Sequence, residues 1–188
     1  MTRVAIQGIR GSYSEEAAVA MLGRQVAFVE CASFDEAIAA VRDRRADAAV
    51  LPVANKITGS VEPAASLVAA SGVPVVRRER LAIEHVLIAA GECEIRDLKV
   101  VVSHIQALRQ CSAFLAANPH LRPVPATDTA TAVRSAIEGS AVAAIGSARA
   151  AEIHGGQVLA RNIADDAGNW TEFVLVGHSN DQRGNEKC

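Results

Sequence analysis

The sequence predicts an α/β fold made of two Rossmann-like α/β lobes with a cleft between them. Short β-branched runs alternate with longer, Ala-rich amphipathic stretches, which is typical of parallel sheets covered by helices. The order strand-helix-strand-helix-strand occurs twice, near residues 3–53 and 98–146. Aromatic residues make up 3% of the chain and hydrophobic residues 50%, so the core is expected to consist of Ala, Val, Ile and Leu.

The first half of the chain contains three expected helices, each opened by a hydroxyl residue. Ser14 is expected to cap the first helix, and Ser33 forms a capping box with Glu36 at the second. Ser60 is expected to cap the third, with Pro63 in its first turn, where a missing N–H does no harm. The strands of this half are expected at residues 3–7, 26–30 and 47–53.

Residues 73–90 break this rhythm, because two extended segments follow one another with a charged middle. This stretch predicts a crossover between the lobes. The first lobe is therefore predicted to contain residues 1–77 plus 171–188, with a strand near 171–176 returning to it. The second lobe is predicted to contain residues 78–170.

The second half restarts the alternation with three more hydroxyl residues at expected helix starts. Ser103 and Gln106 form a capping box, Thr127 or Thr129 opens the next helix, and Ser147 opens the last. The strands are expected at residues 98–102, 121–126, 141–146, 157–161 and 170–176.

The hydroxyl caps expected on several helices suggest a binding site for a small anion. Helices that follow parallel strands begin at the carboxyl edge of the sheet, where α/β proteins bind ligands. Their free N–H groups attract anions, so several such helices predict a site for a small anion. The alternative interpretation is plain capping, because Ser and Thr favour N-caps in any protein. A ligand-binding module similar to type II periplasmic binding proteins fits this pattern as well as an enzyme does.

Composition and motifs exclude several other classes of function. The formal net charge is −2 with charges well mixed, and the chain has one Trp and one Tyr, so no nucleic-acid surface is expected. No apolar run is long enough for a membrane span or a signal peptide, and a cytoplasmic location is expected. No Cys/His group has metal-ligand spacing, so no metal is expected. No GxSxG, phosphate-binding or dinucleotide-binding motif is present either.

Three segments of the first half resemble motifs of the prephenate dehydratase catalytic domain. IQGIRGSYSEEAA at 6–18 resembles LGPxGTFSxxAA. LPVANKITGSV at 51–61 resembles VPIENSxEGSV. LAIEHVLIA at 81–89 resembles LPIxHxLL.

The second half continues the likeness in family order, so that it covers about residues 4–177. SHIQALRQCSAFL at 103–115 is similar to SHPQALxQCxxFL, which is a long and specific match. AAIGSARAAEIHGGQVLARNI at 143–163 resembles AAIASxxAAxxYGLxxLxxxI. NWTEFVLVG at 169–177 resembles NxTRFxVxG.

The resemblance implies a lyase that converts prephenate, a dicarboxylate, to phenylpyruvate without a metal or organic cofactor, as a homodimer, in phenylalanine biosynthesis. Thr171 matches the catalytic threonine of the TRF motif. The matching substrate-binding positions are Asn55, Gly59, Ser60, Ser103, His104, Gln106, Thr129 and Ser147. The chain ends soon after the last strand, without the family's regulatory ACT domain, so feedback control by phenylalanine is not expected.

Two departures from the family pattern keep other functions open. The Arg of TRF is Glu172 here, and the Glu of the EN pair is Ala54, so the two changes compensate if those side chains pair in the family. One alternative is a prephenate decarboxylase that gives a non-aromatic product in a specialised pathway. A further alternative is a non-catalytic sensor of a small anion.

Overall fold

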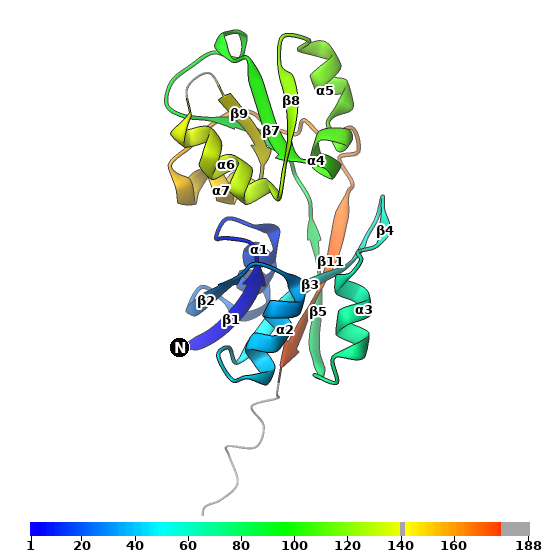
Figure 1. Ribbon diagram of the computed structural model, residues 1–188. Helices are drawn as coiled ribbons and strands as arrows, with labels where there is room; N and C mark the ends of the chain where they lie inside the picture. Colours follow the sequence, from blue (N-terminus) through cyan, green and yellow to red (C-terminus); the bar gives the residue numbers. More distant parts are fainter. Residues whose placement is uncertain (140–141, 178–188) are drawn as a thin grey trace, which may run out of the picture. The chain divides into compact units, whose positions relative to one another are not determined.

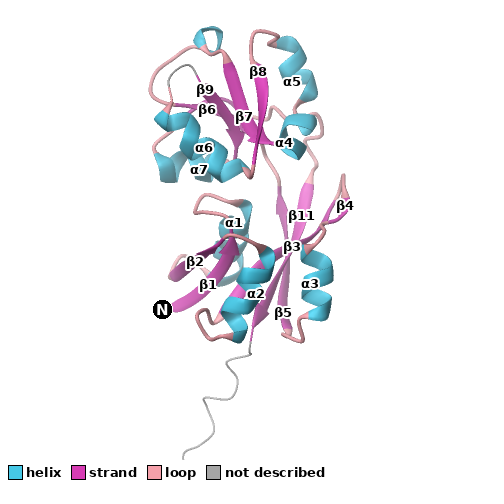
Figure 2. Cartoon of the chain, viewed as in Figure 1, coloured by secondary structure: helices cyan, strands magenta, loops and turns pink. Residues whose placement is uncertain are grey.

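The computed structural model describes residues 1–139 and 142–177, which form two α/β units, each with its own sheet (Figures 1 and 2). Unit 1 contains Met1–Gln7, Ala17–Leu81 and the described residues from Thr171 onward. Unit 2 contains Gly8–Glu16 and Ala82–Trp170. The predicted α/β class with two sheets is confirmed.

Unit 1 is built on a sheet with the strand order β2-β1-β3-β11-β5, and β4 pairs with the end of β3. β1, β2 and β3 run parallel, whereas β11 runs antiparallel to β3. The strands are β1 (Thr2–Gln7), β2 (Val26–Cys31), β3 (Ala48–Asn55), β4 (Gly59–Ser60), β5 (Val75–Ala82) and β11 (Trp170–Gly177). The helices are α1 (Tyr13–Leu22), α2 (Phe34–Arg42) and α3 (Ala64–Ala70).

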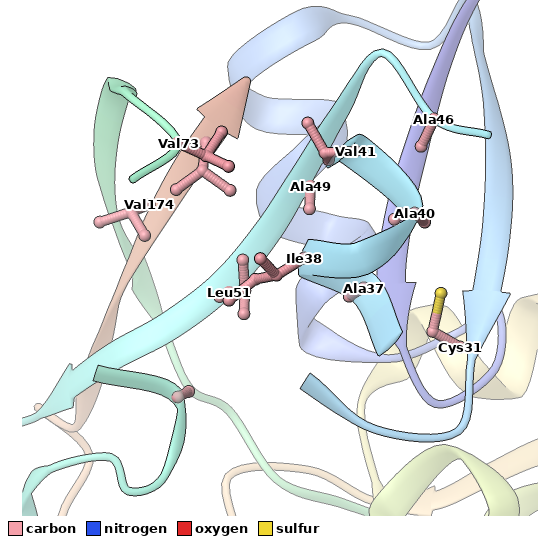
Figure 3. Packing of buried hydrophobic residues seen from close by; sticks show 13 residues of the cluster. Cys31, Ala37, Ile38, Ala40, Val41, Ala46, Ala49, Leu51, Val73 and Val174 are labelled. Carbon is pink, nitrogen blue, oxygen red and sulfur yellow. The ribbon is translucent and has the colours of Figure 1, made fainter. Parts of the chain in front are cut away.

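Helix α2 covers part of this sheet and shows why the segment is helical. Its apolar residues recur at helical spacing, and Ile38 and Val41 pack toward β3 beside Leu51 and Ala49 (Figure 3). Ser33 caps the helix by accepting a hydrogen bond from the Glu36 amide at 3.1 Å, as predicted. Burying a side chain such as Ile38 stabilises the fold by about 2–3 kcal/mol.

Unit 2 is built on a second sheet with the order β10-β6-β9-β7-β8. β7, β8 and β9 run parallel, whereas β6 and β10 are antiparallel additions. The strands are β6 (Val86–Ala89), β7 (Val100–His104), β8 (Arg122–Ala126), β9 (Val142–Gly146) and β10 (Gln157–Ala160). The helices are α4 (Ile105–Gln110), α5 (Ser112–Ala117), α6 (Thr129–Glu138) and α7 (Ala148–His154), with a 3-10 turn at Ile95–Asp97.

The expected parallel pairing is found for β1, β2 and β3 and for β7, β8 and β9, but both sheets also contain antiparallel strands. Strand-helix-strand order predicts parallel neighbours only where a helix connects two strands directly. β6 follows the strand β5 and β11 follows a loop after β10, so no helix directly precedes either strand, and each enters its sheet antiparallel to a neighbour. Residue 141 of the strand expected at 141–146, and residues 178–188 of the predicted first lobe, lie outside the described residues.

Most of the expected hydroxyl caps are also wrong. Ser14 lies inside α1, where the Ser12 hydroxyl accepts from the Glu15 amide instead. Ser60 lies in β4, and α3 begins only at Ala64. Of the six expected hydroxyl caps, the structure confirms Ser33 at α2 and Ser147 at α7.

Two helices of unit 2 are capped by residues that the sequence analysis passed over. β7 continues through Ser103, so His104 becomes the cap of α4 and its Nδ1 accepts from the Gln106 amide at 3.3 Å. Asp128 caps α6, because its carboxylate accepts from the Thr131 amide at 2.7 Å.

The boundaries of the two units differ from those of the predicted lobes at residues 8–16 and near residue 78. The prediction has residues 8–16 in the first lobe and begins the second lobe at residue 78. In the structure residues 8–16 are grouped with unit 2, where the Ser147 hydroxyl donates to the Gly11 carbonyl at 3.0 Å. Thr171 begins the returning segment of unit 1.

Candidate functional site

Thr171 and Asn55 meet on neighbouring strands of unit 1, although 116 residues separate them in the sequence. β11 and β3 pair antiparallel with Thr171 opposite Asn55, and the Asn55 Nδ2 donates to the Thr171 Oγ1 at 2.9 Å. Thr171 is 8% exposed. The structure thus brings together two residues that the sequence analysis selected from separate motifs.

The loop after β3 fixes which end of the Asn55 amide faces Thr171. The Asn55 Oδ1 accepts from the backbone amides of Ile57 and Thr58, at 3.0 and 3.1 Å. The oxygen is therefore turned toward the loop, and the NH₂ group is the end that reaches Thr171. Because the Thr171 oxygen accepts in this contact, its own hydroxyl proton is not used there and remains able to donate.

The ion pairs next to Thr171 involve Glu172, the residue at the first departure from the family pattern. Glu172 bridges Arg78 and Arg80 of β5, with both N–O distances at 3.2 Å. Both arginines belong to the charged middle of residues 73–90, the stretch expected to cross between the lobes. In the register of β11 and β3, Glu172 also lies opposite Ala54.

Gly59 and Ser60 form the short strand β4, which pairs with Ala54 and Asn55 at the end of β3. Both residues are exposed, and the Ser60 hydroxyl donates to Glu62 at 2.6 Å. The hairpin between β3 and β4 places Gly59 opposite Asn55, so residues of the same motif are also neighbours in the fold.

In unit 2, five of the selected residues lie just beyond or at the carboxyl ends of three adjacent parallel strands. These strands are β9, β7 and β8, whose carboxyl ends share one edge of the sheet. Parallel sheets commonly bind ligands at this edge. The residues are Ser103 and His104 at the end of β7, Gln106 in α4, Thr129 at the start of α6, and Ser147 after β9.

The five residues differ in what their side chains can still do. Ser103 is fully buried and donates to the Ile145 carbonyl at 2.6 Å, so its hydroxyl proton ties β7 to β9. Ser147 is also buried and is occupied with capping α7 and with Gly11. Gln106 is exposed, whereas His104 and Thr129 are half-buried, so these three side chains are the more accessible ones.

A buried carboxylate holds the segment before α1 in unit 2. Glu15 is fully buried and accepts from Arg10, from the Gly11 amide and from Arg149, at 3.1, 2.6 and 3.3 Å. Burial alone raises the pKa of Glu15, but these hydrogen bonds outweigh it and leave the pKa below its ordinary value. Glu15 is therefore charged at neutral pH and anchors this loop.

A second polar cluster of unit 2 joins residues from four of the matched motifs. The Tyr13 hydroxyl lies 2.8 Å from the Glu84 carbonyl and 2.9 Å from His85 Nδ1. His85 Nε2 lies 2.9 Å from the Gln110 amide, which Asn169 approaches at 3.5 Å. His85 is buried and hydrogen-bonded, and none of these residues was selected from the sequence. The sequence signal that could have identified these partners is their position inside the matched motifs.

The described residues offer neither a metal-binding cluster nor a membrane-spanning helix. Within residues 1–139 and 142–177, no group of three or more His, Cys, Asp or Glu side chains could hold a metal ion. In the same residues, no helix has the length and apolar character needed to cross a membrane.

Comparisons with known proteins agree with the motif resemblance. The family model described as prephenate dehydratase matches residues 4–181. A curated relative from Arabidopsis thaliana, "Arogenate dehydratase/prephenate dehydratase 2, chloroplastic", is 37% identical over 93% of this chain and 46% of its own length. The "Bifunctional chorismate mutase/prephenate dehydratase" of Escherichia coli (strain K12) is 32% identical over 93% of this chain and 46% of its own length. The chain thus spans less than half the length of either relative.

A solved structure shows the same fold. The prephenate dehydratase of Arthrobacter aurescens, in complex with L-Phe, superimposes with a TM-score of 0.86 and is 28% identical. The match covers 94% of this chain and 60% of that structure's chain. The fold of both units is therefore shared with a protein of that name.

Proposed function

Because this chain belongs to the prephenate dehydratase family, we propose that it is a lyase that converts prephenate to phenylpyruvate. In this reaction the ring carboxylate leaves as carbon dioxide, and the electron pair of the broken bond enters the ring. The C4 hydroxyl leaves with a proton as water, and the ring becomes aromatic. The enzyme must therefore stabilise a departing hydroxyl group and bind two carboxylates.

The observation that carries this proposal is the hydrogen bond from Asn55 to Thr171. Since Asn55 donates, the Thr171 proton is free to point at another acceptor, and the leaving hydroxyl of prephenate is such an acceptor. A threonine hydroxyl is too weak an acid to transfer its proton fully, so its role is to donate a hydrogen bond as charge develops on the leaving oxygen. Thr171 is the proposed catalytic residue.

The remaining residues from the motif resemblance are proposed substrate contacts. Asn55 orients Thr171, while the exposed Gly59 and Ser60 offer polar groups in unit 1. In unit 2 the accessible side chains of Gln106, His104 and Thr129 are the stronger candidates. Ser103 and Ser147 support that edge of the sheet through their buried hydrogen bonds.

A second candidate reaction is decarboxylation of prephenate to a non-aromatic product. The pair Ala54 and Glu172 favours it, because both positions depart from the family pattern and lie opposite each other beside Thr171. A different charge arrangement next to the catalytic threonine could favour loss of carbon dioxide without loss of water.

The product formed from prephenate distinguishes these reactions. Purified protein is incubated with prephenate and the product is identified by NMR, with the Thr171→Ala variant as control. We expect phenylpyruvate. A non-aromatic acid would favour the decarboxylase, and binding without turnover would favour a sensor. Arogenate is tested in parallel, because the Arabidopsis relative carries both substrate names.

The cellular role follows from the same proposal. A phenylpyruvate-forming lyase serves phenylalanine biosynthesis, and we propose that this one acts in the cytoplasm as a homodimer. Light scattering of the purified protein tests the dimer directly, and a monomer at working concentrations would contradict it.

A further inference from the structure

The loop at residues 161–169 leads from β10 to β11 and is hydrogen-bonded to other segments of unit 2. Near its start, Ile163 is 7% exposed, and its amide donates to the His85 carbonyl at 3.2 Å. At its end, Asn169 is buried, and its carbonyl accepts from the Ile83 amide at 3.0 Å. Both ends of the loop are therefore bound to the segment that precedes β6.

The middle of the loop is bound to the junction of α4 and α5 through Asp165. Its amide donates to the Gln110 carbonyl at 2.7 Å. Its carboxylate accepts from the Ser112 hydroxyl at 2.7 Å, and from the amides of Ser112 and Ala113 at 3.1 and 3.0 Å. The hydrogen bond from the Ser112 hydroxyl is the main cause that lowers the pKa of Asp165, so this carboxyl group is ionised at neutral pH.

These contacts make Asp165 a helix cap supplied from a distant segment. Ser112 and Ala113 open α5, and the first amides of a helix have no acceptor within the helix itself. The residue at the N-cap position is Cys111, whose sulfur is a weak acceptor, whereas a carboxylate accepts strongly. One carboxylate from the loop thus supplies α5 with the acceptor that its own N-cap residue is poorly suited to provide.

The Gln110 side chain contacts the end of the same loop. Its Oε1 lies 2.9 Å from His85 Nε2 and 3.5 Å from Asn169 Nδ2, and both nitrogens can donate to it. Because the main-chain carbonyl of Gln110 accepts from Asp165, this residue contacts both the middle and the end of the loop. A movement at Asp165 would therefore be transmitted to Asn169.

The end of the loop determines where β11 begins. Thr171 follows Asn169 by two residues, so their Cα atoms are at most about 7 Å apart. A displacement of Asn169 therefore moves the chain next to the proposed catalytic threonine. A misplacement of about 1 Å at a reacting group can cost about 100-fold in rate, so the anchoring of this loop matters for catalysis.

We propose that Asp165 is a positioning residue for Thr171. By binding the loop at residues 161–169 to the start of α5, it fixes the first residues of β11 and with them the direction of the Thr171 hydroxyl. Asp165 acts on the loop and not on the substrate. The catalytic consequence rests on the proposed function, whereas the anchoring of the loop does not.

NMR and hydrogen exchange test the anchor without substrate. In Asp165→Ala, the Ile83 amide, which donates to the end of the loop, should exchange about tenfold faster, and the Thr171 methyl signal should shift. Asp165→Asn keeps one acceptor oxygen and should change both readouts less, and it gives the same comparison if Asp165→Ala does not fold. The control is Asp97→Ala, which removes another carboxylate that accepts from a backbone amide in unit 2 and should leave both readouts unchanged. Wild-type exchange of Ile83 in both Asp165 variants would overturn the proposal.

The kinetic test separates positioning from a general loss of stability. At a temperature where all variants are folded, Asp165→Ala should lower kcat for prephenate about tenfold with KM nearly unchanged, because Thr171 is displaced while the substrate contacts remain. Asp165→Asn should recover part of the rate, and Asp97→Ala should retain it. An unchanged kcat in Asp165→Ala would overturn the positioning of Thr171. Inactive wild-type protein would instead refute the proposed function, and the Ile83 exchange and the Thr171 signal would still decide whether Asp165 holds Thr171 in place.

Discussion

Glu172 on β11 lies directly opposite Ala54 on β3, so the two positions that depart from the family pattern are cross-strand neighbours. In the family pattern these positions carry Arg and Glu, which would pair across the same two strands. In this chain the acid is on β11, and its basic partners are Arg78 and Arg80 on β5. The carboxylate at position 172 is thus paired with β5 and not with β3.

This relationship predicts a rescue between residues 172 and 54. Glu172→Arg should lower the free energy of unfolding by about 1 kcal/mol, because it removes two partly exposed ion pairs and places a third positive charge beside Arg78 and Arg80. Ala54→Glu, added to that variant, should recover about half of the loss. Urea unfolding measures both, and Ala54→Glu alone is the control, expected to destabilise. Rescue would fail if residues 54 and 172 did not face the same side.

Product identity in Glu172→Arg is a separate outcome. We expect it to stay the same, because the Thr171 hydroxyl is oriented by Asn55 and not by Glu172. NMR of the product gives the answer. A change from a non-aromatic acid to phenylpyruvate would make residue 172 the switch between the two reactions.

Thr171→Ala should lower kcat far more than it weakens prephenate binding. The lost hydrogen bond forms mainly in the transition state, and by analogy with removed oxyanion donors its loss costs about 2–4 kcal/mol, or roughly 30- to 1,000-fold in rate. Thr171→Ser keeps the hydroxyl and serves as the control, with a smaller loss. An unchanged kcat in Thr171→Ala would remove Thr171 from the mechanism.

The buried imidazole of His85 predicts acid sensitivity. Burial lowers its pKa in the native state, whereas in the unfolded chain the pKa is about 6.5. Between these two values the unfolded chain binds more protons, so the free energy of unfolding should fall as the pH drops below about 6.5. Denaturant titrations across this range measure the slope. His85→Gln should flatten it, and an equal slope in that variant would assign the effect to other groups.

The cysteines should react with alkylating reagents at different rates. Burial raises the pKa of Cys111 to about 12, and burial also raises the pKa of Cys31, so both thiols stay protonated and covered. Cys93 is only half-buried and should be modified first among these three. Peptide mass spectrometry after a short exposure to iodoacetamide measures the modification of each cysteine. Cys188 lies outside the described residues, and its peptide is quantified separately. Early modification of Cys111 would contradict the buried position.

Gly11 should not tolerate a side chain. Its φ is +90°, and an added Cβ would lie 2.8 Å from the Ala150 Cα. Gly23 is a matched control, because it has a φ of +80° with no atom within 4 Å of an added Cβ. Gly11→Ala should therefore lose about 1–3 kcal/mol more than Gly23→Ala in urea unfolding. Equal losses would mean that the close approach to α7 relaxes without cost.

The hydrophobic pattern along the chain predicted most helices and strands. Where it failed, the cause was the exact residue at which a strand ends. Ser103 and Ser147 both follow an apolar strand, and the sequence pattern predicts a helix cap at each of them. β9 ends at Gly146 and leaves Ser147 free to cap, whereas β7 extends to His104 and keeps Ser103 in the sheet. Two residues of strand length decide the role, and hydrophobic periodicity does not define strand ends that finely.

Contacts between distant segments were predictable only through the motifs. The pairing of Asn55 with Thr171 requires the direction and register of β11 against β3, which alternation along the chain does not specify. The motif resemblance selected both residues but gave no geometry. The Tyr13, His85 and Gln110 cluster was missed because each residue has an ordinary local interpretation, and only folding brings the three together.

The way the two units share the chain has a consequence for synthesis on the ribosome. Unit 1 takes its strand β11 from the residues after Trp170, and β11 lies between β3 and β5 in the finished sheet. Until that segment has emerged, the nascent sheet has no strand between β3 and β5. Unit 2 likewise needs residues 8–16, which are synthesised long before Ala82. Neither unit is one continuous stretch of nascent chain, and unit 1 cannot be completed until β11 has emerged.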